Sequence, residues 1–445
     1  MKLLKDKTFY KFLIPSLIGL FLFVTPVQSG GNLTIPIAVI ANALLTAMGD
    51  WSSLAIYVLV SISGIVTIVH KLVKLPFIRD HEKLNALFDV KGVWLLVRML
   101  GLVLVNLLYW GVGPEAILSE DTGGLVLHGL MPILVCVFLL AGLLLSLLLN
   151  FGLLDFFGAL LIKLMRPVFN LPGRSALDCI ASWLGDGSVG VLLTAKQYEE
   201  GFYSKREATV IATTFSAVSI TFCQVVISEV GLEHMFIPFY LTVGLAGIVA
   251  AIIVPKLPPL SRVPDSYCVR KPYPEDIPAG STAAQYGLKL ALDKAAKAPS
   301  LGGFLKEGFV TVFEMWFGTL PVILSLGTLA LILAEYTPVF KVLGVVFIPL
   351  YELLQLPEAA AASQTVLVGF ADMFLPSVIA SGFESEMTKF VVAATSVTQL
   401  IYMSEIGSII MGSKIPVSLK DLFLIFLERT IVTLPVIALA AHIIF

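Results

Sequence analysis

Charged residues are scarce in this 445-residue chain: Asp, Glu, Lys and Arg make up 13% of it, whereas hydrophobic residues make up 58%. The formal net charge is −2, so the chain lacks the basic excess with which proteins bind nucleic acids. The mean hydropathy is +0.95. This composition excludes an ordinary soluble globule and is typical of a polytopic α-helical protein embedded in a lipid bilayer.

Cysteine is also rare, and its pattern excludes two further classes of site. Cys136, Cys179 and Cys223 lie in apolar segments, and Cys268 lies in a polar loop. There is no CxxC pair and no cluster of His and Cys, so we expect neither a disulfide framework nor a metal site. The chain also lacks an ATP-binding Walker sequence, and no cofactor is expected.

Hydrophobic runs long enough to span a membrane recur along the chain. They lie near 10–28, 53–73, 93–114, 127–149, 206–228, 235–254, 309–333, 387–411 and 419–443. The sequence therefore predicts an all-α polytopic membrane protein with about nine transmembrane helices. The basic, then apolar, N-terminus is also compatible with a signal peptide; we interpret it as an uncleaved first helix because its charges fit the topology derived below.

Two stretches share one layout, and each is too short to cross the membrane twice. Leu171–Phe202 and Leu356–Phe383 both begin with Leu-Pro, break at a tip that carries an aspartate, and close with Gly-Phe. The tip residues Asp186 and Asp372 are 186 positions apart. A carboxylate at bilayer depth is costly and indicates function. Two of them at matching positions of a repeat indicate one site at the repeat interface.

The repeat extends beyond these hairpins, since Gly158 matches Gly344 at the same spacing. Each copy reads as a span, an interfacial helix, a hairpin and two further spans. Three crossings are an odd number, so the second copy must be inverted. The predicted divisions are N-terminal transmembrane helices (1–120), a first repeat with a cytoplasmic hairpin (125–254), a cytoplasmic linker ending in an amphipathic helix (255–305), and a second repeat with an outer hairpin (306–445).

Basic residues give the orientation. They gather on one face if both hairpins re-enter the membrane: Lys163, Arg174 and Lys205 surround the first hairpin, whereas Glu358 and Glu384 flank the second. The positive-inside rule makes the basic face cytoplasmic. The N-terminus is then expected inside and the C-terminus outside, in the inner membrane of a bacterium.

The first tip reads LGDGSVG, and irregular backbone at this depth is tolerated only where it lines a cavity or is buried in protein. The substrate-binding candidates here are Asp186, Gly187 and Ser188, with Ser182 on the entering arm. Asp186 has the chemistry to ligate Na⁺, carry a proton or bind a substrate amine or hydroxyl. The alternative is a helix-capping Asp without a ligand.

The second hairpin and the polar spans that follow both hairpins supply the remaining candidates. The substrate-binding set continues with Asp372, Ser363, Gln364, Thr365, Thr398 and Gln399, and the coupling-ion set is Glu405, Thr214, Ser216, Thr395, Ser396 and Gln224. A hydroxyl in a membrane helix often bonds back to its own helix instead. Gln224 and Glu405 are 181 apart, which predicts an asymmetric proton or cation site. An alternative alignment pairs Glu405 with Glu229, nearer an interface.

The two hairpins, the tip WLGDGS and the polar spans ATTFSAVSITF and AATSVTQLIYMSEIGS resemble bacterial nucleoside recognition, or Gate-domain, membrane proteins of the YjiH type. The resemblance covers roughly 125–445. The superfamily includes concentrative nucleoside transporters, and the resemblance implies an inverted repeat with a ligand held between the hairpin tips and the broken helices that follow. Here Gly-Asp-Gly-Ser stands where those transporters carry a Gln-x-x-Glu pair.

These features predict an ion-coupled secondary active transporter, not an enzyme. The expected solute is small and polar: nucleoside-like, an amino acid or a small peptide. Since no ATP signature is present, a gradient of Na⁺ or H⁺ is the expected energy source. A channel, a membrane scaffold and an intramembrane hydrolase stay as alternatives, and association into a homo-oligomer is left open.

Overall fold

Backbone groups in a bilayer have no water to bond, so apolar runs must satisfy them within helices. The structure, a computed structural model, describes residues 7–29, 32–90, 92–184, 187–215, 218–269, 277–278 and 280–445. It is almost entirely helical and confirms the predicted all-α polytopic class. One short antiparallel pair, β1 (Val27–Ser29) with β2 (Asn32–Thr34), is the exception among these residues.

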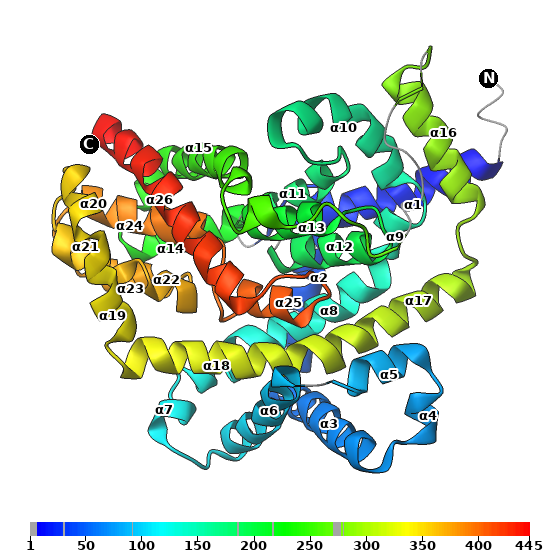
Figure 1. Cartoon of the computed structure of the whole chain (residues 1–445), viewed down its shortest axis with the longest axis horizontal. Helices are drawn as coiled ribbons and strands as arrows, with labels where there is room; N and C mark the ends of the chain where they lie inside the picture. Colours follow the sequence, from blue (N-terminus) through cyan, green and yellow to red (C-terminus); the bar gives the residue numbers. More distant parts are fainter. Residues whose placement is uncertain are drawn as a thin grey trace.

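The N-terminal quarter of the chain packs on several parts of both repeats. Its helices are α1 (Lys7–Val24), α2 (Pro36–Met48), α3 (Trp51–Val73), α4 (Pro76–Arg79), α5 (Glu82–Phe88), α6 (Val93–Trp110) and α7 (Glu115–Leu118). The antiparallel pair α3 and α6 lies below the long rod formed by α17 (Leu301–Glu314) and α18 (Leu320–Tyr336) (Figure 1). Of these helices, α1 packs against the entering arm of the first hairpin (Ser175–Leu184), whereas α3 and α6 pack against the rod.

The first repeat has the predicted order of elements. It contains α8 (Met131–Leu144), α9 (Ser146–Leu149), α10 (Leu153–Phe169), the hairpin helices α11 (Ser175–Leu184) and α12 (Gly187–Glu199), then α13 (Lys205–Val210), α14 (Ile220–Glu229) and α15 (Phe236–Ile253). A π-helical segment, Leu125–Leu130, precedes α8, and another, Ile211–Phe215, extends α13.

The second repeat follows the same order. After α17, the π-helical Met315–Thr319 and α18 come α19 (Val339–Gly344), α20 (Ile348–Leu353), the hairpin helices α21 (Ala359–Thr365), α22 (Val368–Ala371) and α23 (Leu375–Ser381), then α24 (Glu386–Gln399), α25 (Ile406–Gly412) and α26 (Leu419–Ile444). The two copies share the order of segments but not every helix, since α19 and α20 stand where the first copy has α10, and the second hairpin has three helices where the first has two.

Three of the nine predicted spans are not among the long apolar helices: the run 10–28 ends as α1 at Val24 before β1, and two others are not continuous helices. Six helical segments of the described chain are long and apolar enough to cross a membrane: Trp51–Val73, Val93–Trp110, Leu125–Leu149, Glu233–Lys256, Leu301–Tyr336 and Leu419–Ile444. The polar runs after each hairpin are instead broken: Val218 and Ser219 are not helical before α14 begins at Ile220, and α24 ends at Gln399 before α25. Leu400, just past α24, has a φ of 62°, a left-handed conformation that ends a helix.

Matching glycines seat each hairpin on its interfacial helix. A Cβ on Gly158 of α10 would lie 3.3 Å from Arg174 Cβ, at the entry to the first hairpin. A Cβ on Gly344 of α19 would lie 2.7 Å from the carbonyl oxygen of Ser363 and 2.9 Å from Gln364 Cα. Both glycines thus allow close approach of the hairpin backbone, which explains their shared position in the repeat.

The bases of the hairpins are held by different polar contacts. Arg174 pairs with Asp155 of α10 at 3.1 Å, and its guanidinium lies 3.6 Å from the ring centre of Phe202, which closes the first hairpin. At the second base, Glu358 accepts hydrogen bonds from the backbone N–H groups of Glu384 and Ser385 at 3.2 and 3.1 Å. Opening and closing residues of each hairpin therefore meet.

The linker helix α16 (Ala283–Ala296) packs against α1 and α10. Its small residues Ala291 and Ala295 are fully buried against a cluster that includes Phe12 of α1. A Cβ on Gly287 would lie 2.8 Å from the carbonyl oxygen of Phe156 in α10. The apolar face that the sequence predicts for the membrane surface is thus covered by α1 and α10.

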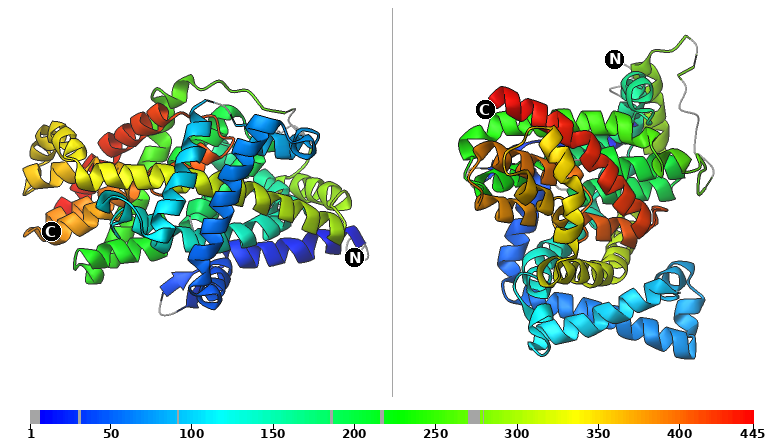
Figure 2. Two further views of the ribbon diagram at one scale, coloured as in Figure 1. Left: turned by 90° about the horizontal axis from the view of Figure 1, so that it is seen from below. Right: turned by 60° about the vertical axis from the view of Figure 1, so that its left-hand side comes forward.

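The two ends of the described chain lie at opposite ends of the long axis. α1 begins near α16 at one end, and α26 finishes beside α20 and α21 at the other (Figure 1). Seen from the side, α3 and α6 project from the rest of the molecule (Figure 2). The positions of the termini relative to a membrane stay predictions.

Candidate functional site

A small cavity lies where the first hairpin meets the broken helices of both repeats. It has a volume of about 70 Å³. Among the residues that line it are Ser182, Gly187, Ser219, Met373, Tyr402 and Glu405. Since these come from both hairpins and from both broken helices, the cavity lies at the repeat interface. Three of the sequence-predicted residues, Ser182, Gly187 and Glu405, are brought together here.

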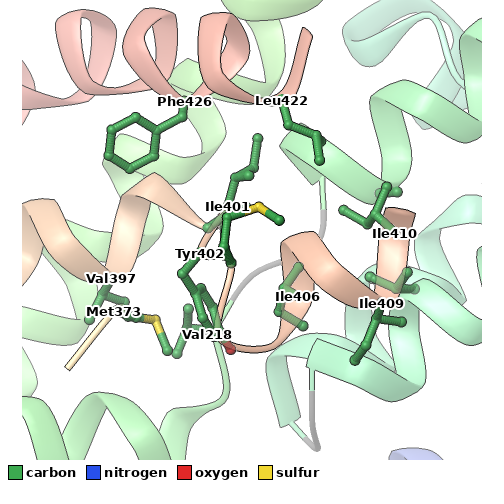
Figure 3. Packing of buried hydrophobic residues seen from close by; sticks show 14 of the residues in the cluster. Val218, Met373, Val397, Ile401, Tyr402, Ile406, Ile409, Ile410, Leu422 and Phe426 are labelled. Atoms are coloured by element: carbon green, nitrogen blue, oxygen red, sulfur yellow. The ribbon is translucent and has the colours of Figure 1, made fainter. Parts of the chain in front are cut away.

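The cavity carries a carboxylate beside hydroxyl groups. The Tyr402 hydroxyl donates to Glu405 Oε2 at 3.2 Å, and the side chain of Glu405 is partly exposed. Apolar side chains surround Tyr402 and the break in the second polar span (Figure 3), among them Met373, Ile406 and Leu422. A few polar groups on an apolar wall are typical of a small-molecule site, although such pockets usually measure about 300–1,000 Å³. At about 70 Å³, this cavity is smaller than such a pocket.

The first tip contacts the second repeat directly. A Cβ on Gly187 would lie 3.1 Å from Ile406 Cδ1 of α25, so glycine allows the tip to approach α25. Ser188 is buried in the first turn of α12. The predicted tip aspartate, Asp186, and the predicted ion ligand Ser216 lie outside the described residues, and their roles stay predictions.

Asp372 at the second tip has the contacts of a helix cap. Its Oδ1 accepts hydrogen bonds from the backbone N–H groups of Phe374 and Leu375 at 2.7 and 3.3 Å, at the start of α23. Its Oδ2 accepts the Ser404 hydroxyl at 2.6 Å. The backbone N–H of Ser404 also donates to the Ala371 carbonyl at 2.9 Å. Asp372 thus ties the second tip to the break in the second polar span, and binding of substrate by it stays a prediction.

Most of the other predicted hydroxyls bond back to their own helices. The hydroxyls of Thr214, Ser363, Thr365, Ser396 and Thr398 donate to carbonyls three or four residues earlier, at 2.7–3.0 Å. Thr395 is buried, Gln224 is half-buried, and Gln364 is exposed. None of these side chains lines the small cavity. They shape the helices around the site, and direct contact with solute or ion stays a prediction for each.

Gln399 joins the second hairpin to α26. Its Nε2 donates to the Val366 carbonyl at 3.1 Å and to the Thr430 hydroxyl at 2.9 Å, while its buried Oε1 has no partner among the described residues. The side chain lies against Gly369, where a Cβ would come within 2.1 Å of Oε1. Gln399 therefore positions the hairpin rather than lining the cavity.

The sequence analysis missed Asp178, a fully buried carboxylate on the entering arm of the first hairpin. Gln197 Nε2 donates to its Oδ1 at 2.7 Å, and the hydroxyls of Thr194 and Tyr203 donate to its Oδ2 at 2.9 and 3.0 Å. Asp178 thereby bonds the two arms to each other and to the residue after the closing Phe202. A buried carboxylate is tolerated when its lone pairs are satisfied in this way.

Arg429 was also missed, although it lies in the middle of a predicted span. Its guanidinium is 1% exposed and bonds to backbone carbonyls of both broken helices: Thr398, from Nε and Nη2 at 3.0 and 2.7 Å, and Thr214, from Nη1 at 2.9 Å. One side chain therefore connects the two repeats where their helices break.

A larger cavity of about 740 Å³ separates the first hairpin from helices α6, α17 and α18. Ion pairs cross its wall: Lys196 of the hairpin pairs with Glu314 of α17 at 2.9 Å, and Glu199 pairs with Lys414 at 3.3 Å. We call this space the vestibule. It is lined by basic residues, among them Lys83, on the face that the positive-inside rule makes cytoplasmic.

Comparisons with known proteins found a partial family match, a full-length relative and two distant structures. Residues 131–233 match the family described as Gate, nucleoside recognition. The chain is 51% identical over 437 residues to an uncharacterized protein of Alkalihalophilus pseudofirmus, in an alignment that covers 98% of this chain and 94% of the relative. Two variants of CNTnw in an outward-facing state are weakly similar in structure, with TM-scores of 0.41 and 0.29, and each is 11% identical in sequence. The first alignment covers 97% of this chain and 100% of the CNTnw chain, and the second covers 92% and 97%. The chain therefore belongs to the same family as the Alkalihalophilus protein; it is a multi-pass membrane protein whose residues 131–233 match the nucleoside recognition, or Gate, family.

Proposed function

We propose that this protein is a secondary active transporter of a small polar solute, nucleoside-like in the first instance, in a bacterial inner membrane. The observation that carries the proposal is the cavity at the repeat interface, where the first hairpin meets both broken helices beside the carboxylate of Glu405. Inverted-repeat transporters bind their solutes at such an interface. The match of residues 131–233 to a nucleoside recognition family supports the solute class.

The two cavities support alternating access. The central site, at about 70 Å³, is too small for a nucleoside, whereas the vestibule, at about 740 Å³, is large enough. Movement of the first hairpin away from α25 would join them. The ion pairs of Lys196 and Glu199 lie on the part of the hairpin that would have to move. We propose that solute passes between the vestibule and the central site and that an ion gradient drives the cycle.

Glu405 is the residue whose replacement tests the solute site. Glu405→Gln keeps the shape of the side chain and removes its charge. If Glu405 accepts a hydrogen bond from the solute, the affinity should fall by about 10- to 100-fold, as for loss of a charged hydrogen bond. Thermal shift with a panel of nucleosides, amino acids, small peptides and carboxylates identifies the ligand, because a ligand of the folded state raises the Tm.

The control for this test is Glu386→Gln. Glu386 is an exposed carboxylate in the first turn of α24, outside the cavity. Its replacement should leave the affinity unchanged. A solute that binds wild-type protein and Glu405→Gln equally well would reject this cavity as the binding site.

The orientation predicts opposite labelling of two positions at the hairpin bases. The exposed native thiol of Cys268 donates to the Tyr198 carbonyl at 2.7 Å near the end of the first hairpin, whereas the other three cysteines are buried or half-buried. In whole cells a membrane-impermeant maleimide should leave Cys268 unlabelled until the membrane is permeabilised. Glu384→Cys in a Cys268→Ser background should be labelled from outside. Labelling of both positions from the same side would contradict the inverted arrangement.

A further inference from the structure

The buried guanidinium of Arg429 occupies the point where the broken helices of the two repeats come together. It lies at the eleventh of the 26 positions of α26, which is long and apolar enough to span the membrane. Charged groups at such a depth are rare and are held by partners inside the protein. No carboxylate of the described chain lies within ion-pair distance of Arg429, whose guanidinium donates to the carbonyls of Thr214 and Thr398.

Helix ends explain how this charge is compensated. Thr398 lies in the last turn of α24, and Thr214 lies within four residues of Val218, which is no longer helical. The last four carbonyls of a helix have no partner within it. Each helix C-terminus also carries about half a negative charge. Two C-termini that converge on one guanidinium therefore supply about one negative charge and match its single positive charge.

Free carbonyls at the ends of broken helices are also the ligands with which inverted-repeat transporters hold a coupling cation. In this chain two such carbonyls, one from each repeat, already bond to the same side chain. The hydroxyls of Thr214 and Thr398 do not point to an additional cation, because they donate to the carbonyls of Val210 and Thr395 at 2.8 and 3.0 Å. The carbonyl oxygens that a bound Na⁺ would need as ligands already accept hydrogen bonds from Arg429.

We propose that Arg429 is a built-in cation that fills the carbonyl site between the repeats, so that the protein binds no coupling Na⁺ there. Arg429 moves with α26 and cannot be released, so the charge at this point is the same in every state of the cycle. The consequence for energy coupling rests on the proposed transporter function: coupling would then use a proton or an exchanged solute. The occupancy of the carbonyl site does not depend on that function.

The test is thermal unfolding of the purified full-length protein, without solute, in NaCl and in choline chloride of equal ionic strength. Wild-type protein should unfold at the same Tm in both salts. Arg429→Ala should unfold at a lower Tm, and Na⁺ or low concentrations of methylguanidinium should raise that Tm saturably, because either cation can enter the vacated carbonyl site. If Arg429→Ala gives no folded protein, Arg429→Gln, which is also uncharged, takes its place with the same expectation.

The matched control is Arg98→Ala. Arg98 is likewise buried and donates to a backbone carbonyl, that of Leu87, at 2.7 Å, and to the Thr67 hydroxyl at 3.1 Å, but it lies outside the repeat interface. Its removal should lower the Tm without creating a response to Na⁺. A saturable, Na⁺-specific rise in the Tm of wild-type protein would overturn the proposal, as would uncharged variants of Arg429 that fold and respond to neither cation. Since no solute is present, failure here is distinguishable from failure of the proposed transport function.

Discussion

Replacing Gly173 with alanine is expected to leave little or no folded protein. A Cβ at this position would lie 2.0 Å from the carbonyl oxygen of Gly158 and 2.7 Å from the backbone nitrogen of Ile162. Both atoms belong to the backbone of α10 and cannot rotate away. Overpacking usually costs about 1–3 kcal/mol and occasionally more, so a backbone clash should cost about 3 kcal/mol or more.

The measurement is the Tm of the purified protein, with Gly302→Ala as the control. Gly302 lies in α17, and a Cβ there would meet no atom within 4 Å. Alanine at a helical glycine usually stabilises by about 0.5–1 kcal/mol. Gly302→Ala should therefore unfold at or above the wild-type Tm. If Gly173→Ala also unfolds at the wild-type Tm, the hairpin is not seated on α10 as described.

Asp178→Ala is expected to loosen the first hairpin. Without the carboxylate, the buried donors of Gln197, Thr194 and Tyr203 lose an acceptor. A buried polar group left unsatisfied costs about 1–3 kcal/mol, so the loss should total about 3 kcal/mol. The Tm should fall steeply, and solute binding should weaken because the hairpin supplies Ser182 and Gly187 to the central cavity.

Asp421→Ala provides the comparison for Asp178→Ala. Asp421 completes a capping box with Ser418 at the start of α26, and loss of such a cap costs about 1 kcal/mol. Asp178→Asn, which keeps one acceptor oxygen, should fall between the two variants. Equal Tm values for Asp178→Ala and Asp421→Ala would mean that the buried network does not hold the hairpin together.

The hairpins could be predicted because the residues that begin, break and end them act on the local backbone. Leu-Pro, a broken tip and Gly-Phe each restrict the backbone, and two copies at one spacing made the pattern recognisable. The structure has a hairpin at both positions, and the paired glycines Gly158 and Gly344 each contact a hairpin. Repeat symmetry thus gave the order of elements without any knowledge of tertiary contacts.

The polar network in the first hairpin could not be predicted in the same way. Asp178 and its partner Tyr203 are 25 residues apart, on either side of the tip, and nothing in the spacing indicates that their side chains meet. The sequence pattern indicates the aspartates at the tips. In the structure, Asp372 caps α23, and Asp178 accepts the hydrogen bonds that join the two hairpin arms. Which carboxylate bonds to protein depends on tertiary packing.

Arg429, in contrast, carried a signal that sequence reasoning could have used. It is the sole Lys or Arg between Lys420 and the last residue, Phe445, and follows Glu428 in a mostly apolar run. The rule that led to the tip aspartates, that a charged residue at bilayer depth indicates function, applies equally to a basic residue. Its partners are backbone carbonyls, which no sequence pattern reveals, so the link between the repeats required the structure.

Counterflow of radiolabelled solute in proteoliposomes tests the central claim most directly. Vesicles preloaded with an unlabelled solute that raises the Tm of the purified protein are diluted into labelled solute at a lower concentration. A carrier that exposes one closed site alternately to each side should accumulate label transiently above equilibrium, and Glu405→Gln should reduce that overshoot while Glu386→Gln does not. Label that only equilibrates, without overshoot, would indicate a channel, and the absence of any protein-dependent uptake would contradict transport altogether.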